Sequence, residues 1–140
     1  IDLFSRQVIG WRLRQDMTRD IVIDALGMAW FKRHPSKQSG LIFHSDRGSQ
    51  YASQDFRDVL TEYGITASMS RRGNCYDNTV AESFFSSLKK EIIKKKIYAT
   101  RQDAQSEIFE YIEVFYNRKR RHSHLNQLSP MAFELLQFGS

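Results

Sequence analysis

Residues 41–51 read LIFHSDRGSQY, and the apolar run that opens this stretch has the length and composition of a buried strand. Asp46 follows that run. In open α/β sheets ligands bind outside the carboxyl ends of the strands, so this position is typical of a catalytic or metal-binding carboxylate. Gly48 permits a sharp turn beyond the strand. Because an acid beside a strand is also common in solvated loops, a chemical role for Asp46 needs support from elsewhere in the chain.

A second carboxylate, Glu82, lies in the segment 73–91, GNCYDNTVAESFFSSLKKE, and thirty-five residues separate it from Asp46. One interpretation is structural, because Thr79 and Glu82 have the spacing of a capping box, in which Thr caps a helix and Glu bonds back to its amide. Helix geometry favours another interpretation. At about 100° per residue, Glu82 and Lys89 share one flank, away from the apolar stripe that contains Phe84 and Leu88. That flank presents an acid for a metal and a base for a phosphate.

Three segments of the chain resemble the catalytic domain of the insertion-sequence-three family of bacterial transposases. They are HSDRGSQY (44–51), SRRGNCYDNTVAESFFSSLKKE (70–91) and YNRKRRHSHLNQLSPMAFE (116–134), and the resemblance begins with IDLFSRQVIGW (1–11). The interval between Asp46 and Glu82 is similar to the D-(35)-E half of the signature shared by DDE transposases and retroviral integrases.

The resemblance implies an α/β fold, ribonuclease-H-like and retroviral-integrase-like, with a mixed sheet flanked by helices. It also implies that Asp46 and Glu82 are catalytic and bind Mg²⁺ or Mn²⁺. The family's first catalytic Asp lies on an earlier strand, upstream of the DLFSR segment, and that strand is missing here. Asp2 is therefore interpreted as a strand-edge acid, and this stretch alone is expected to be catalytically poor.

The implied activity is metal-dependent phosphodiester cleavage and strand transfer at insertion-element ends, by a homo-oligomer assembled on DNA. The expected setting is the bacterial cytoplasm, in association with the nucleoid. Two alternatives remain open. One is a ribonuclease-H-like nuclease that hydrolyses without joining strands, and the other is a DNA-binding or assembly module without catalysis.

Composition agrees with a nucleic-acid partner. The 140 residues carry a net charge of +5 and a pI of about 9.5, which favours binding to a polyanion. The single cysteine excludes an internal disulfide. No apolar stretch approaches the roughly 18 residues of a membrane helix. We expect residues 1–117 to form an N-terminally truncated catalytic core and residues 118–140 a basic C-terminal tail with a short helix that begins at Ser129-Pro130.

Basic residues in three places are candidates for DNA contact: a loop, a helix and the tail. In the related enzymes the loop before the catalytic helix touches DNA, although a solvated turn would also explain these residues. Four consecutive cations after a helix favour phosphate contact. His122 and His124 lack the further ligands of a zinc site. The candidates are Arg71, Arg72, Lys89, Arg118, Lys119, Arg120 and Arg121.

Periodicity and turn residues predict the remaining elements. Apolar residues at helical spacing, with Ser or Thr before them, predict three helices, and shorter runs predict strands. We expect helices at Thr18–Arg33, Ser53–Tyr63 and Thr100–Arg118, a strand at Ile65–Ser70, and two strands, Ile1–Phe4 and Gln7–Leu13, joined by a turn at Ser5-Arg6.

Overall fold

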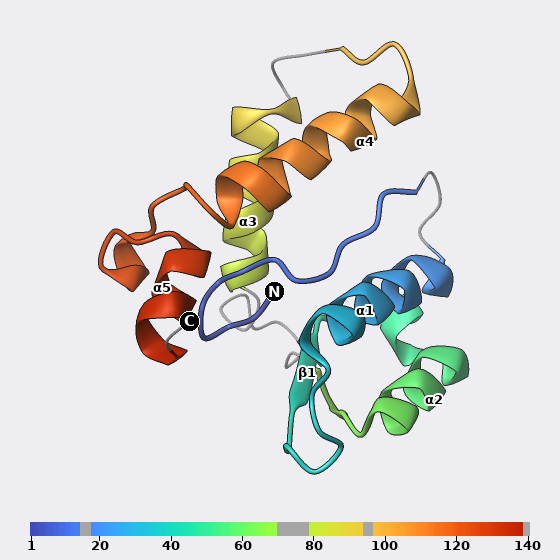
Figure 1. The fold of residues 1–140 in the computed structure, drawn as a ribbon. Coiled ribbons are helices and arrows are strands. Elements are labelled where there is room, and N and C mark those ends of the chain that lie inside the picture. Colours follow the sequence, from blue (N-terminus) through green and yellow to red (C-terminus); the bar gives the residue numbers. More distant parts are fainter. Residues whose placement is uncertain (15–17, 70–78, 94–96, 139–140) are drawn as a thin grey trace. The chain divides into compact units, whose positions relative to one another are not determined.

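The computed structural model describes residues 1–14, 18–69, 79–93 and 97–138 (Figure 1). The chain divides into two compact units. One comprises residues 9–79, and the other comprises residues 1–8 together with residues 80–140. The boundary expected after residue 117 stays a prediction, although the residues on both sides of it belong to the second of these units.

Unit 9–79 contains a small parallel sheet and two helices. Helix α1 spans Arg19–Arg33 and α2 spans Gln54–Tyr63, while strands β1 and β2 span Ile42–Ser45 and Thr66–Met69. A short 3-10 helix, η1, covers Ser49–Ala52. The two strands pair from Ile42 opposite Thr66 to Ser45 opposite Met69. Both helices and both strands lie where the sequence predicted them, within one residue at most ends.

Local chemistry explains where α2 begins and ends. The Ser53 hydroxyl accepts a hydrogen bond from the Phe56 amide at 3.2 Å, which satisfies a free donor of the first turn. Gly64 ends the helix in the left-handed conformation, with a φ of 72° that suits glycine. The buried side chains of Leu26, Phe56 and Leu60 then join both helices to the sheet in one apolar core.

The unit formed by residues 1–8 and 80–140 is helical. Helix α3 spans Thr79–Glu91, α4 spans Arg101–Phe109 and continues as a π-helix, η3, through Glu110–Tyr116, and α5 spans Pro130–Phe138. A 3-10 turn, η4, covers Ser123–Leu125. Thr100 caps α4, accepting a hydrogen bond from the Asp103 amide at 3.1 Å. The predicted helix from Thr100 is therefore confirmed as far as Tyr116, and Pro130 occupies the first position of α5 as expected.

Helix α3 and the α4–η3 helix supply most of the buried apolar side chains of this unit. Those from the helices are Phe84, Leu88, Ile108, Tyr111, Ile112 and Tyr116. The N-terminal turn joins them, since the Phe4 ring lies 5.2 Å from that of Phe133 and the Ser5 hydroxyl donates to Glu134 at 2.9 Å. Figure 1 shows this turn, in blue, beside α5, in red.

The expected strands at Ile1–Phe4 and Gln7–Leu13 are wrong, because residues 1–14 form a turn and an extended segment without a strand ladder. The turn expected at Ser5-Arg6 is present. The Asp2 amide donates to the Gln7 carbonyl and the Arg6 amide to the Asp2 carbonyl, which closes the loop. The Asp2 carboxylate accepts from the Phe4 amide at 2.9 Å, so this acid stabilises a turn and not a strand edge.

Within the described residues, none of the helices combines the length and the apolar character that crossing a bilayer demands.

Candidate functional site

Asp46 is the first residue beyond β1, at the carboxyl end of the strand, as the sequence predicted. Its side chain is exposed, and its Oδ1 accepts a hydrogen bond from the Gly48 amide at 2.7 Å. Gly48 is crowded there: a Cβ on it would lie 2.9 Å from the Asp46 Oδ1 and 2.9 Å from the Gln50 Oε1. The backbone after β1 therefore orients the carboxylate, and a side chain at position 48 would displace the Asp46 or the Gln50 side chain.

Tyr51 lies close enough to Asp46 for the carboxylate charge to affect its pKa. Tyr51 was not identified from the sequence as a residue of this site. Burial, followed by the charge of the Asp46 carboxylate, raises the pKa of Tyr51. Its ring packs against Phe43 at 6.0 Å and Phe56 at 5.7 Å. A neutral, packed phenol therefore borders the Asp46 turn. An aromatic residue directly after the Asp-Arg-Gly-Ser-Gln run was the one signal in the sequence that could have identified it.

Glu82 lies in the first turn of α3 with its side chain exposed, while Phe84 and Leu88 form the buried face. Thr79 is the first residue of α3 that the structure describes, and Glu82 follows it three positions later. The capping-box interpretation of Thr79 and Glu82 therefore stays open beside the functional one. Lys89 is exposed two turns farther along the same helix, as the predicted flank requires.

Asp46 and Glu82 belong to different units, so their pairing at one site stays a prediction. Within the described ranges, no three His, Cys, Asp or Glu side chains come together as a metal-binding group. The donor chemistry of the two carboxylates nevertheless fits a hard cation, because Mg²⁺ prefers oxygen ligands and keeps several waters of its own. Both carboxylates are exposed and could reach such an ion.

The four basic residues after η3, residues 118–121, do not all have the same surroundings. Arg118, Lys119 and Arg121 are exposed. Arg120, by contrast, donates to the Glu91 Oε1 from Nε at 3.2 Å and from Nη2 at 3.1 Å. Its guanidinium also lies 5.8 Å from the centre of the Tyr116 ring. Three cations of the run are thus available to a partner, whereas Arg120 is held inside the unit. Arg71 and Arg72 lie outside the described residues.

Glu91 is the centre of a network that the sequence did not indicate. The Tyr111 hydroxyl donates to its Oε2, while Arg120 occupies its Oε1 and donates to the Ser87 hydroxyl at 3.3 Å. Burial and then the hydrogen bond to Glu91 raise the pKa of Tyr111. This network fixes the end of α3 to η3 and to the start of the tail. Its members are far apart in sequence, and no local pattern links them.

His122 follows the basic run and is directed into the unit. Its Nε2 is buried and makes no hydrogen bond among the described residues, and its ring meets the Tyr116 ring edge-on at 4.9 Å. Burial, and then the positive charges of Arg120 and Arg6, lower the pKa of His122. The imidazole ring therefore packs against Tyr116 inside the unit.

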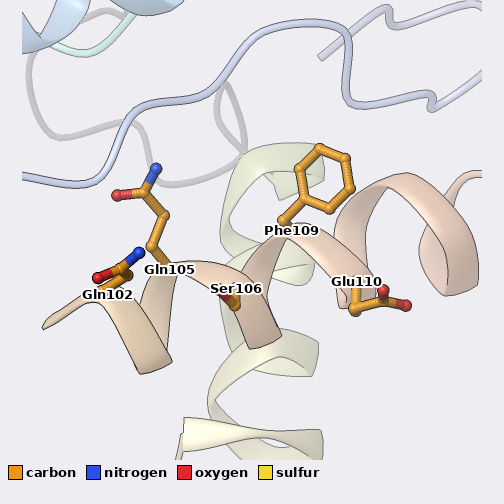
Figure 2. A pocket seen from close by; sticks show the side chains of 5 residues that line it. All are labelled: Gln102, Gln105, Ser106, Phe109 and Glu110. Atoms are coloured by element: carbon orange, nitrogen blue, oxygen red, sulfur yellow. The ribbon is translucent and has the colours of Figure 1, made fainter. Parts of the chain in front are cut away.

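A hollow lies along α4 and contains none of the predicted site residues. Figure 2 shows the five side chains that line it, all from one face of α4 and the start of η3. They are Gln102, Gln105, Ser106, Phe109 and Glu110.

Comparison with known families and proteins gives a consistent result. Two family models, each described as Integrase core domain, match the chain, one over residues 1–75 and the other over residues 82–137. The transposase for insertion sequence element IS904 of Lactococcus lactis subsp. lactis (strain IL1403) is 47% identical over 134 residues, which cover 96% of this chain and 52% of that protein. Transposase InsF for insertion sequence IS3A of Escherichia coli (strain K12) is 46% identical over 134 residues, which cover 96% of this chain and 46% of that protein. The chain thus spans about half the length of these curated relatives.

A solved structure shares the fold. It is the cryoEM structure of the simian T-cell lymphotropic virus intasome in complex with PP2A regulatory subunit B56 gamma, matched with a TM-score of 0.67 and 18% identity over 86% of this chain and 41% of that chain. At this identity the likeness shows the fold alone. The expected ribonuclease-H-like, integrase-like fold is confirmed, and the transposase relatives bear out the resemblance carried by the three sequence segments.

Proposed function

Because this chain belongs to the integrase core domain family, we propose that it acts in the catalytic domain of a DNA transposase of the insertion-sequence-three kind. The observation that carries the proposal is the exposed Asp46 carboxylate at the carboxyl end of β1, oriented by the Gly48 amide. The proposed reaction is cleavage of a phosphodiester at an insertion-element end, followed by attack of the 3′-OH on target DNA.

Asp46 and Glu82 would hold Mg²⁺ or Mn²⁺, in keeping with their exposed carboxylates. Bound divalent ions supply an activated oxygen nucleophile and relieve the negative charge on the attacking and leaving oxygens. The chain's own contribution is placement. The Gly48 amide holds one Asp46 oxygen in position, and the buried Phe84 and Leu88 fix the helix from which Glu82 projects.

DNA would be held by exposed cations, whose contacts with phosphates release counterions. Lys89, Arg118, Lys119 and Arg121 are the candidates that the structure leaves exposed, and Arg71 and Arg72 are proposed with them. Arg120 has a different expected role. Its bonds to Glu91 hold the basic run against α3, so it would position neighbouring cations more than it contacts DNA itself.

The proposed partners are insertion-element ends, target DNA and further copies of the same chain. The transposase relatives and the intasome assembly of the structural neighbour support this proposal by similarity. Association with the bacterial nucleoid would follow from DNA binding.

The catalytic assignment is tested in the full-length protein with Asp46→Asn and Glu82→Gln. Each change removes a ligand charge at nearly constant volume, so both strand cleavage and strand joining should be abolished while DNA binding is kept. Asp58→Asn and Glu62→Gln, on the exposed face of α2, are the matched controls and should keep full activity. Glu82→Gln with full activity and lower thermal stability would return Glu82 to a structural role.

The same assay separates transposase from nuclease. A transposase should join pre-cut 3′-OH ends to a target duplex in the presence of Mg²⁺. A protein that cuts DNA but never joins these ends would instead be the hydrolytic nuclease, and the transposase proposal would be abandoned.

DNA binding is tested by replacing Arg118, Lys119 and Arg121 together with Gln. Affinity for element-end DNA should fall, and the salt dependence of log K should become less steep by about 0.9 for each phosphate that the variant no longer neutralises. Titrations at several salt concentrations measure this slope. An unchanged slope would show that the three cations form only a solvated surface.

A further inference from the structure

Arg6 stands at the tip of a turn that is anchored on both sides. On one side the buried Ser5 donates to Glu134 of α5 at 2.9 Å. On the other, the backbone of the buried Val8 is bonded to the Asn117 side chain. Because its neighbours are fixed inside the unit, the position of Arg6 is set by the fold and not by a free terminus.

The backbone of Arg6 is in the left-handed region, with a φ of 66°. This conformation is unfavourable for a residue with a side chain and favours glycine. Backbone strain of this kind persists where the surrounding structure imposes it, and it is common at binding sites. Glycine would adopt this conformation more easily. An arginine at this position therefore indicates that its side chain has a role.

The charge of Arg6 affects the pKa of two residues that flank the basic run 118–121. It acts on Tyr116, which lies just before the run, and on His122, which follows it directly. The Val8 anchor is Asn117, the residue that precedes Arg118. Arg6 therefore shares a neighbourhood with the exposed cations of the tail, although more than a hundred residues separate them in sequence.

Several arginines of the chain form ion pairs with carboxylates. Arg12 and Arg14 both lie within 3.5 Å of Asp24, and Arg120 is bound to Glu91. Arg6 forms no ion pair with a carboxylate in the part of the chain that the structure describes. Its positive charge adds to that of the run, and such a concentration of charge is compensated most directly by a phosphate.

We propose that Arg6 is a DNA-phosphate contact on the same surface as Arg118, Lys119 and Arg121. This inference rests on the proposed function, because it assumes that the surface binds DNA. Anchored between Ser5 and Val8, Arg6 presents a planar guanidinium that suits bidentate contact with a phosphate. Its backbone strain is maintained for that contact.

The test uses the full-length protein and a duplex that carries one end of its own insertion element. Arg6→Gly removes the charge and also relieves the left-handed strain, so folding should be kept and the melting temperature unchanged or raised. Binding should nevertheless weaken several-fold at constant salt, and the slope of log K against log salt should fall by about 0.9. Arg6→Asn removes the charge with another residue that tolerates a positive φ, and should give the same result.

Two controls isolate the contact. Arg6→Lys keeps the charge and should keep the slope. Arg101→Gln removes one exposed charge at the start of α4, in the same unit, and should leave the slope unchanged. If the triple variant of Arg118, Lys119 and Arg121 loses binding but Arg6→Gly and Arg6→Asn both keep the slope of log K against log salt, the proposal for Arg6 is overturned. If the triple variant also keeps its slope, the DNA-binding surface itself is refuted.

Discussion

The side-chain amide of Asn117 bonds to both backbone groups of Val8. The Val8 amide donates to the Asn117 Oδ1 at 2.9 Å, and the Asn117 Nδ2 donates to the Val8 carbonyl at 2.9 Å. An asparagine side chain thus satisfies the two backbone groups that a neighbouring strand would otherwise satisfy. Both residues are buried, and the pair ties the N-terminal turn to the residue that precedes the basic run.

Asn117→Ala should lower the free energy of unfolding by about 2–4 kcal/mol. The change leaves the buried amide and carbonyl of Val8 without partners, and each unsatisfied group costs about 1–3 kcal/mol. Urea unfolding measures the decrease. Asn126→Gly is the matched control, because Asn126 is exposed with a φ of 54° that glycine accepts, and it should be neutral or stabilising. Equal effects of the two changes would contradict the role given to Asn117.

Gly10 and Gly27 should respond oppositely to alanine. A Cβ on Gly10 would collide with the carbonyl oxygen of Ala25 and lie 2.9 Å from the backbone nitrogen of Ala29, so Gly10→Ala should destabilise by about 3 kcal/mol. A Cβ on Gly27 would meet only the Tyr63 hydroxyl, at 4.0 Å, so Gly27→Ala should stabilise helix α1 by roughly 0.5–1 kcal/mol. Thermal melts of both variants check the pair. A stable Gly10→Ala variant would show that the extended segment does not lie against α1.

The hydrogen bond between Tyr111 and Glu91 should make stability fall at alkaline pH. Burial and then the bond to Glu91 raise the pKa of Tyr111 in the folded state. The resulting stability is fully present below the unfolded-state pKa of about 10 and is lost as the pH rises towards the folded-state value. Tyr111→Phe should therefore show a shallower decline in unfolding free energy from about pH 9 upward. Urea unfolding at a series of pH values measures the unfolding free energy of both proteins. If the two plots of unfolding free energy against pH are parallel, Tyr111 does not contribute to the alkaline loss of stability.

Gly48→Ala should impair catalysis more than folding. The added Cβ would lie 2.9 Å from the Asp46 Oδ1 and would displace the carboxylate from its bond to the Gly48 amide. If Asp46 holds a metal as proposed, a displacement of this kind should lower strand-joining activity by roughly ten- to a hundredfold. The decrease in stability should stay below about 1 kcal/mol, because the contacted atoms are the ends of flexible side chains. Strand-joining assays and thermal melts on the same preparation measure the loss of activity and the loss of stability. Unaltered joining activity would contradict the prediction.

Elements built from neighbouring residues could be predicted from the sequence. The apolar stripe of α1, the Ser53 cap and Gly64 stop of α2, and the Thr100 cap of α4 all depend on residues within a few positions of one another. The same holds for Asp46, since the strand before it and the glycine after it are encoded in one short segment. Local hydrogen bonds and helical spacing are enough to specify such features.

The conformation of residues 1–14 was decided by tertiary structure. Alternating apolar residues predicted strands there, but a strand forms only where another backbone supplies its hydrogen bonds. Val8 is bonded instead to Asn117, 109 residues away, and the next segment is paired with α1 through ion pairs to Asp24. The network of Glu91, Tyr111 and Arg120 likewise joins residues 20 and 29 positions apart. These contacts depend on which surfaces meet after folding, and a linear pattern carries no information about distant partners. The pairing of Asp46 with Glu82 is of the same non-local kind, and it was predicted from a family resemblance because local chemistry could not specify it.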